Sequence, residues 1–359
     1  MSHSYQIIDA DCHVWEPPEI WAKYLEPEAG SHTLSRSFEL DGEPIYYKIA
    51  NTALAVGPAI KARDSEIYGI TGYDAASVVK AISVLGAEFA FLYPSVGGWL
   101  LAIDEMDARL AGAFVRAYNN WLRDFCAHDP SVMRGVGAVN LHAPDEMVPE
   151  LRRIAGFGWK AVVVRPNPIK GRLLSDLAYE PFWGECERLD IAVGIHEGSH
   201  ARVPSAGADR FNSQFAMHAC SHPMEQMMAL LALIEGGVLE RHPRLRFAFL
   251  EAGGGWIPYW LWRLDREYHD LEWEVRGNVT MKPSDYFRRQ CFVAVEPTEP
   301  YLGPLMDFIG EDNILIGSDF PHMDHDPNVM KDAIGLEGTL SRGTVEKLLW
   351  HNPKRFYGI

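Results

Sequence analysis

Short apolar runs recur along the chain, and most are followed by a segment in which apolar residues return every three or four positions. A run such as AVVV at Ala161–Val164 is apolar on both faces, which is typical of a strand buried on both sides of a parallel sheet. We therefore predict eight strands, at Gln6–Ala10, Glu88–Tyr93, Met133–Val139, Ala161–Val164, Ala192–Ile195, Arg246–Leu250, Phe292–Val295 and Ile314–Ile316.

Helical segments are expected between these strands. From Asp104 to His128, apolar side chains at spacings of three and four form one stripe, which predicts a long amphipathic helix. Further helices are predicted at Pro223–Glu240, Trp256–Glu274 and Arg342–Leu349. The alternation of strands and helices predicts an α/β fold and favours a closed (β/α)8 barrel, although an open doubly wound sheet has the same alternation.

Two intervals, Val14–Val79 and Glu197–Ser221, are too long for simple connections. They follow the first and the fifth strand at the ends where barrel loops build active sites, so we interpret both as insertions that cover a substrate. No internal repeat, charge block or Gly/Ser-rich linker marks a boundary. Residues 1–359 are therefore predicted to form a single barrel domain.

The formal net charge of −16 argues against a nucleic-acid or anionic-membrane partner, because both require a basic surface. No segment approaches the roughly 18 apolar residues of a membrane span, and the N-terminus does not resemble a signal peptide. Five scattered cysteines without a C-x-x-C pair fit reduced thiols better than a disulfide framework. We expect a cytoplasmic protein.

Polar side chains with metal-binding chemistry stand where three of the predicted strands end. Asp11 and His13 follow the first strand two residues apart, so that in an extended segment both face the same side. His196 follows the fifth strand and Asp319 the eighth. Strand ends converge in a barrel, so these four side chains predict a metal site. If these residues do not bind a metal, Asp11 is a turn residue, His13 a capping residue, His196 a core histidine and Asp319 a helix cap.

Five motifs along the chain resemble the second amidohydrolase family, which contains aminocarboxymuconate semialdehyde decarboxylase and resorcylate-type decarboxylases. They are Asp11-x-His13 followed by Glu16-Pro17, the strand-end His196, FLEAGGGW at Phe249–Trp256, GSDFPH at Gly317–His322, and NPKRFYG at Asn352–Gly358. They span nearly the whole chain in the family's order.

The resemblance implies a distorted (β/α)8 barrel with one divalent ion, usually zinc or manganese, held by Asp11, His13, His196 and Asp319. The first of these positions is commonly His or Glu in the family. The shorter and harder aspartate oxygen fits Mn or Fe as well as Zn.

One departure from the family lies at the end of the sixth strand, where Glu251 stands in place of a catalytic histidine. Glu251 is a candidate general base, a partner of His13 or His196, or a ligand of a second ion together with His218 or His222. The alternative is a carboxylate that caps the Gly-rich helix start. His218 and His222 lie in the long interval after the fifth strand and are candidate catalytic residues, or else ordinary surface histidines.

Three further residues are candidate substrate contacts. Arg165 ends the fourth strand and is able to clamp a carboxylate in bidentate fashion or to pair with a structural acid. Glu296 closes the seventh strand as a supporting or structural acid, and His322 stands in a ligand-rich cluster with Asp324 and His325.

These residues predict a hydrolase in which metal-bound hydroxide attacks an ester, thioester, amide or lactone carbonyl, with Asp319 as ligand and proton acceptor. In that reaction Glu251 or a loop histidine returns the proton. One alternative is non-oxidative decarboxylation of an aromatic or unsaturated carboxylic acid, in which Asp319 protonates the carbon. Another is a metal-binding barrel without catalysis. We expect a small-molecule carboxylic acid or acyl derivative as partner, and a homodimer on family resemblance.

Overall fold

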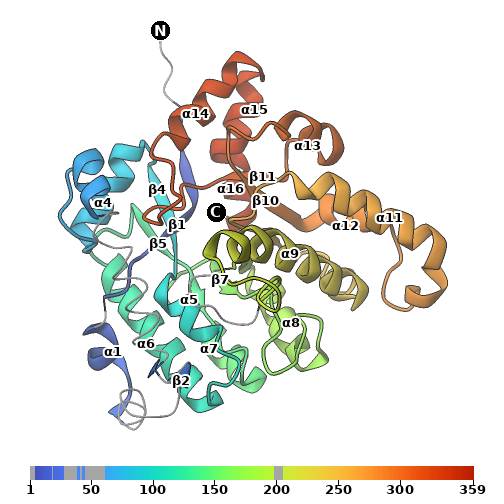
Figure 1. The fold of residues 1–359 in the computed structure, drawn as a ribbon, viewed down its shortest axis with the longest axis horizontal. Helices are drawn as coiled ribbons and strands as arrows, with labels where there is room; N and C mark the ends of the chain where they lie inside the picture. Colours follow the sequence, from blue (N-terminus) through green and yellow to red (C-terminus); the bar gives the residue numbers. More distant parts are fainter. Residues whose placement is uncertain (1–4, 18, 28–38, 41–42, 45–60, 198–204) are drawn as a thin grey trace.

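Eight parallel strand positions form a ring with helices outside it in a computed structural model of the chain (Figure 1). The structure describes residues 5–17, 19–27, 39–40, 43–44, 61–197 and 205–359. The strands are β1 (Ile8–His13), β4 (Phe89–Tyr93), β5 (Met133–Gly135) with β6 (Gly137–Ala138), β7 (Ala161–Val164), β8 (Ala192–Ile195), β9 (Phe247–Phe249), β10 (Cys291–Val295) and β11 (Ile314–Ile316).

The ring is a distorted (β/α)8 barrel, as predicted. One sheet has the order β1-β4-β5 and the other β11-β10-β9-β8-β7-β6. They meet where the predicted strand Met133–Val139 is broken at Val136 into β5 and β6. The other junction is bridged beyond β11, where Asp319 N donates to Asp11 O at 2.8 Å and His13 N donates to Phe320 O at 2.7 Å.

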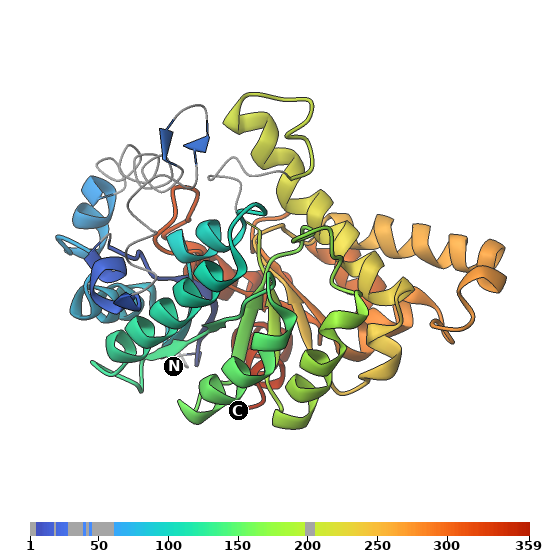
Figure 2. The ribbon, with the colours of Figure 1, turned by 90° about the horizontal axis from the view of Figure 1, so that it is seen from below.

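Helices cover the outside of the barrel and the ends of its strands (Figures 1 and 2). They are α1 (Glu19–Tyr24), α4 (Ala75–Leu85), α5 (Val96–Leu101), α6 (Ala108–Cys126), α7 (Pro144–Gly156), α8 (Glu180–Leu189), α9 (Gln214–Glu235), α10 (Val238–Arg241), α11 (Trp256–Val275), α12 (Pro283–Gln290), α13 (Leu302–Ile309), α14 (Val329–Gly335), α15 (Arg342–Glu346) and α16 (Asn352–Tyr357), with a π-turn at Lys347–His351. Among the described residues, none of the helices has both the length and the apolar character that a membrane crossing needs.

Two predicted helix boundaries were wrong. The helix predicted from Asp104 begins at Ala108, because Asp107 accepts hydrogen bonds from Arg109 N and Leu110 N and so caps the helix start. The helix predicted from Pro223 begins nine residues earlier as α9, after the cap Ser213, so that Pro223 lies inside the helix. The helix predicted at Trp256–Glu274 is confirmed as α11.

The barrel interior is closed at its lower end by the last helix, so the space for chemistry lies at the opposite end. Phe356 and Tyr357 of α16 belong to the same buried cluster as the inward-facing strand residues. The ring of Tyr357 stacks on Phe91, and its hydroxyl donates to Ala10 O at 2.7 Å.

The two predicted insertions lie at the carboxyl ends of β1 and β8. Much of Val14–Val79 and part of Glu197–Ser221 lie outside the described residues, namely 18, 28–38, 41–42, 45–60 and 198–204. Of the described parts, Ala75–Leu85 is the helix α4, and the stretch from Gln214 onward belongs to α9.

Candidate active site

The structure brings the four predicted metal ligands together above the barrel. Asp11 and His13 are the last inward-facing residues of β1, which runs three residues beyond the predicted end at Ala10. His196 directly follows β8, and Asp319 follows β11. The Nε2 atom of His13 lies 3.0 Å from His196 Nε2, 3.3 Å from Asp319 Oδ1 and 3.5 Å from Asp11 Oδ1.

The proton positions on the two histidines leave two lone pairs facing each other. His13 Nδ1 donates to Pro94 O at 3.2 Å, and His196 Nδ1 donates to Glu197 O at 2.8 Å. In the neutral rings both Nε2 atoms therefore carry lone pairs. Asp11 Oδ1 and Asp319 Oδ2, both buried, have no hydrogen-bond donor. Burial would lower the pKa of His196, but Asp11 and Glu251 outweigh burial and raise it to about 9. Either a proton or a metal ion therefore lies among these acceptors.

The separations among Asp11, His13 and His196, and between His13 and Asp319, fit a shared divalent ion. Two atoms that each bind an ion at about 2.1 Å in tetrahedral geometry lie about 3.4 Å apart, close to the observed 3.0–3.5 Å. Two imidazoles and two carboxylates suit zinc, manganese or iron.

Asp319 makes a second close contact, with His322. His322 Nδ1 lies 2.7 Å from Asp319 Oδ1, and His322 Nε2 lies 2.8 Å from Ser95 Oγ. Since the Ser95 hydroxyl donates its hydrogen to Val14 O, its oxygen accepts a hydrogen bond from His322 Nε2. Burial, together with Glu251, Asp324 and Asp11, raises the pKa of Asp319 well above its ordinary value. The Asp319–His322 pair therefore favours keeping a proton.

Glu251 does not cap the helix that follows it, which excludes the capping alternative. Glu299 accepts hydrogen bonds from Gly254 N instead. The Glu251 carboxylate turns into the site, with Oε2 3.5 Å from His196 Nε2 and Oε1 3.5 Å from His222 Nε2. Burial would raise the pKa of Glu251, but the nearby histidines outweigh burial and lower it.

Glu251 and Asp319 share an unusual backbone conformation. Their φ angles are +52° and +54°, in the left-handed region that side chains other than glycine rarely adopt. Such residues cost roughly 1–3 kcal/mol each and gather at functional sites. In both residues this turn aims the carboxylate into the cluster.

His218 and His222 lie on α9, not in a loop as the sequence suggested. His222 is buried, whereas the side chain of His218 is about one-third exposed and faces Asp324 Oδ2 at 3.4 Å. Their rings stack with centroids 4.2 Å apart. The cap at Ser213 extends the helix over both residues and thereby brings them to one face.

Arg165 pairs with an acid, which was one of the two predicted alternatives. Its Nη2 donates to Glu197 Oε1 at 2.8 Å, with both side chains buried, and its Nε donates to Asn167 Oδ1 at 3.2 Å. The other oxygen of Glu197 lies 3.6 Å from His222 Nδ1. Arg165 is thereby linked to His222 through Glu197.

Glu296 lies away from the four-ligand cluster, on the wall of an adjoining acidic pocket. Glu299, Asp324 and Asp326 also line this pocket, together with Asp319 and His222. Burial and the neighbouring carboxylates raise the pKa of Glu296.

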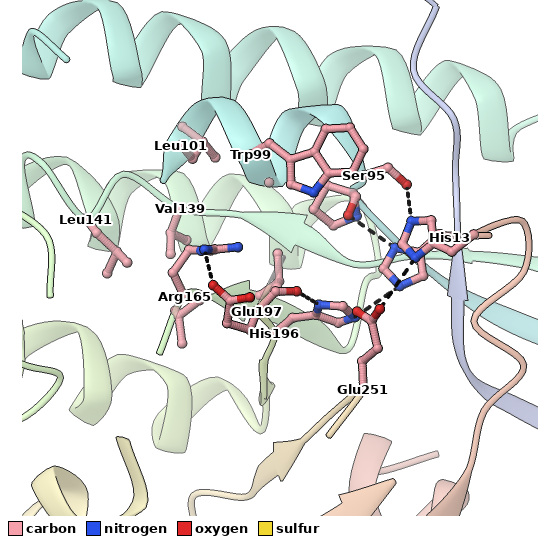
Figure 3. Close-up of a pocket in the computed structure, with 15 residues that line it drawn as sticks. His13, Ser95, Trp99, Leu101, Val139, Leu141, Arg165, His196, Glu197 and Glu251 are labelled. Carbon is pink, nitrogen blue, oxygen red and sulfur yellow. Dashed lines mark hydrogen bonds and ion pairs between the residues drawn. The ribbon is translucent and has the colours of Figure 1, made fainter. Parts of the chain in front are cut away.

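An apolar cavity adjoins the cluster on the side of Arg165 (Figure 3). Its polar end consists of His13, His196, Glu251 and His322. The remaining wall is formed largely by the apolar side chains of Trp99, Leu101, Val139, Leu141 and Val163, and it also includes Ser95 and the Arg165–Glu197 ion pair. A small molecule with one polar end and a flat apolar body fits such a cavity.

Three residues of the site were missed from the sequence. Ser95 holds His322, Glu197 connects Arg165 to His222, and Gln226 of α9 donates to Ile195 O and Leu250 O. The sequence could have indicated Ser95 and Glu197 as site residues, because both follow the carboxyl ends of predicted strands. Gln226 lies in the middle of a helix, where nothing local distinguishes it.

The chain belongs to the amidohydrolase family, whose sequence model matches residues 8–359. It is 26% identical over 266 residues to a 2-amino-3-carboxymuconate-6-semialdehyde decarboxylase of Dictyostelium discoideum, covering 73% of this chain and 70% of that protein. It is 28% identical over 240 residues to a gamma-resorcylate decarboxylase of Rhizobium sp. (strain MTP-10005), covering 61% and 69%.

The fold is similar to that of a 5-carboxyvanillate decarboxylase of Novosphingobium aromaticivorans, with a TM-score of 0.69 and 19% identity over 99% of this chain and 97% of that chain. That structure contains manganese and 4-hydroxy-3-methoxy-5-nitrobenzoic acid. The present protein is thus an enzyme of the amidohydrolase superfamily, a hydrolase or a carboxy-lyase. The named relatives favour the predicted alternative of decarboxylation over the hydrolysis that we placed first.

Proposed function

We propose that this protein is a metal-dependent, non-oxidative decarboxylase of small aromatic or unsaturated carboxylic acids. The observation that carries the proposal is the 2.7 Å contact of Asp319 with His322, beside the convergent acceptors of His13 and His196. Two unprotonated acceptors would repel at that distance unless a proton or the ion stabilises them, and we propose that the pair holds a proton. A decarboxylase needs such a proton next to the carbon that loses carbon dioxide.

We propose Asp11, His13, His196 and Asp319 as the residues that hold the ion. Ligand atoms of Asp11, His13 and His196 lie within 4.8 Å of one another, and Asp319 contacts this group through His13. The related complex supports manganese. A divalent ion held there would supply positive charge that attracts the carboxylate of the substrate. The salt bridge to Glu197 already compensates the charge of Arg165. The substrate carboxylate is therefore directed to the cluster, and Arg165 acts by holding Glu197.

The apolar walls orient the rest of the substrate. Trp99, Leu101, Val139, Leu141 and Val163 leave room for an apolar ring or unsaturated chain and exclude water from it. In that orientation the carbon that bears the carboxylate lies next to the Asp319–His322 pair.

The reaction then moves one proton and breaks one carbon–carbon bond. The Asp319–His322 pair gives its proton to the substrate carbon. The bond to the carboxylate breaks, its electron pair returns to the unsaturated system, and carbon dioxide leaves. Solvent returns the proton to the pair, so that no oxidant or reductant is consumed.

The test is incubation of the manganese-loaded protein with a panel of hydroxybenzoates and unsaturated dicarboxylic acids in D2O. We expect carbon dioxide release and one deuteron on the vacated carbon, measured by mass spectrometry and NMR. Asp319→Asn should lower turnover by roughly 10²- to 10⁴-fold, the usual contribution of a general acid. Asp270→Asn, on the exposed side of α11, is the matched control.

Hydrolysis of esters or lactones with incorporation of ¹⁸O from labelled water, in the absence of any decarboxylation, would restore the hydrolase assignment. Equal turnover by Asp319→Asn and the wild type would remove Asp319 from the proton transfer.

A further inference from the structure

We infer that His218, His222 and Glu251 form a second divalent-cation site beside the first. The two histidines occupy the first and last positions of His-Ala-Cys-Ser-His on α9, so their rings leave the same face of the helix. A ligand atom of each of the three residues lies within 4.8 Å of the others. A pair of helical histidines four residues apart plus a glutamate is an established donor set for zinc and similar ions.

His222 presents a buried ring nitrogen toward Glu251. His222 Nδ1 lies 3.2 Å from Ser221 Oγ and 3.6 Å from Glu197 Oε2. The buried Nε2 atom has no hydrogen-bond partner.

The separation between His222 and Glu251 fits a shared cation. His222 Nε2 lies 3.5 Å from Glu251 Oε1, which is longer than an ordinary hydrogen bond. The same separation is close to the roughly 3.4 Å between two atoms that bind one ion in tetrahedral geometry.

Glu251 connects the two sites. One of its oxygens faces His222 and the other faces His196 Nε2, each at 3.5 Å. A carboxylate between two ions a few ångströms apart is the arrangement of two-metal active sites. The left-handed φ of +52° at Glu251 gives the side chain this position between β8 and α9.

The access route also suits a cation. The adjoining pocket is lined by Glu296, Glu299, Asp324 and Asp326, with His218 and His222 on the same wall. Asp324 lies 3.4 Å from His218 Nε2 and orients this ring. This negative wall raises the local concentration of divalent ions and, unlike the apolar cavity, repels a carboxylate substrate.

The second site adds to the proposed function and concerns ion binding alone. The inference therefore does not depend on whether the enzyme catalyses decarboxylation or hydrolysis.

In the test, metal-free full-length protein is loaded with MnCl2. Bound manganese per chain is counted by mass spectrometry after gel filtration, and the EPR spectrum is recorded. We expect two ions per chain and an exchange-coupled spectrum. His218→Asn should bind one ion with the spectrum of isolated Mn(II), and His222→Asn should do the same.

His269→Asn is the control, because His269 is 78% exposed on α11 and should leave both ions in place. Since His218 is partly exposed, His218→Asn still tests the second site if the variant of the buried residue, His222→Asn, does not fold. Wild-type protein that binds a single ion overturns the second site and leaves the proposed function standing. Wild-type protein that binds no ion overturns both.

Discussion

A Cβ atom at Gly317 would lie 2.3 Å from Cβ of Asp11, so the end of β11 touches β1 with no side chain between them. The same approach lets Asp319 N donate to Asp11 O. Gly317 thereby closes the barrel at the point where Asp11 and Asp319, the first and last of the proposed metal ligands, approach each other.

Gly317→Ala should lower the free energy of unfolding by about 3 kcal/mol, because the added methyl group displaces the Asp11 backbone and side chain. Urea unfolding measures the loss, and manganese uptake should fall with it. The control is Gly343→Ala in α15, where the nearest atom is 3.8 Å away and helix propensity favours alanine by up to about 1 kcal/mol. Equal stability of the two variants would contradict the close approach.

Removing only one partner of the buried Arg165–Glu197 pair should lower the free energy of unfolding more than removing both partners. Arg165→Met leaves a buried unpaired carboxylate and should cost about 3–5 kcal/mol in the free energy of unfolding. Adding Glu197→Gln should recover a large part of that loss. Arg266→Met in the exposed pair with Asp270 should change stability by less than about 1 kcal/mol. Additive effects of the two changes at Arg165 and Glu197, measured by denaturation, would show that the pair is not coupled.

Gln226 should stabilise the ends of β8 and β9. Its Nε2 donates to Ile195 O at 2.9 Å and to Leu250 O at 3.0 Å, directly before His196 and Glu251. Gln226→Met leaves Leu250 O without this donor, whereas Ile195 O still accepts from Leu250 N, and should cost about 1–3 kcal/mol for the unsatisfied group. The exposed Gln6→Met provides the comparison, and thermal melting with and without manganese is the measurement. A variant as stable as the wild type in both states would contradict this role.

His325 should make the protein less stable in mild acid. Burial lowers the pKa of His325 from its ordinary 6.5 to about 4, and its Nδ1 donates to Ser318 O. Between those values the unfolded chain binds more protons than the folded one. The stability is therefore fully present above pH 6.5 and declines as the pH falls toward 4.

The pH effect is isolated by His325→Gln, whose amide is able to donate to Ser318 O and accept from the Tyr68 hydroxyl. The wild type should lose about 2 kcal/mol more than this variant between pH 7 and pH 5, measured by urea unfolding at both values. Parallel pH profiles of the two proteins would show that His325 is not the titrating group.

Much of the fold and of the metal cluster was predictable because the signals were local. An apolar run such as Ala192–Ile195 identifies its own strand, and the polar residue that follows, His196, is adjacent in sequence. Once the strands are parallel and closed in a ring, their carboxyl ends must meet. Asp11, His13 and Asp319 therefore converge with His196 without any knowledge of side-chain packing.

The pairing of buried side chains could not be predicted in the same way, because it depends on packing between elements that are distant in the sequence. Whether Arg165 faced a substrate or Glu197 is decided by where the segment after β8 brings a carboxylate. The start of α9 depended on the Ser213 cap, which outweighed the presence of Pro223, and only that longer helix places His222 opposite Glu251. The sequence alone specified strands and their terminal side chains through short-range periodicity. Buried charge pairing and the meeting of α9 with the barrel arise only when the whole chain is packed.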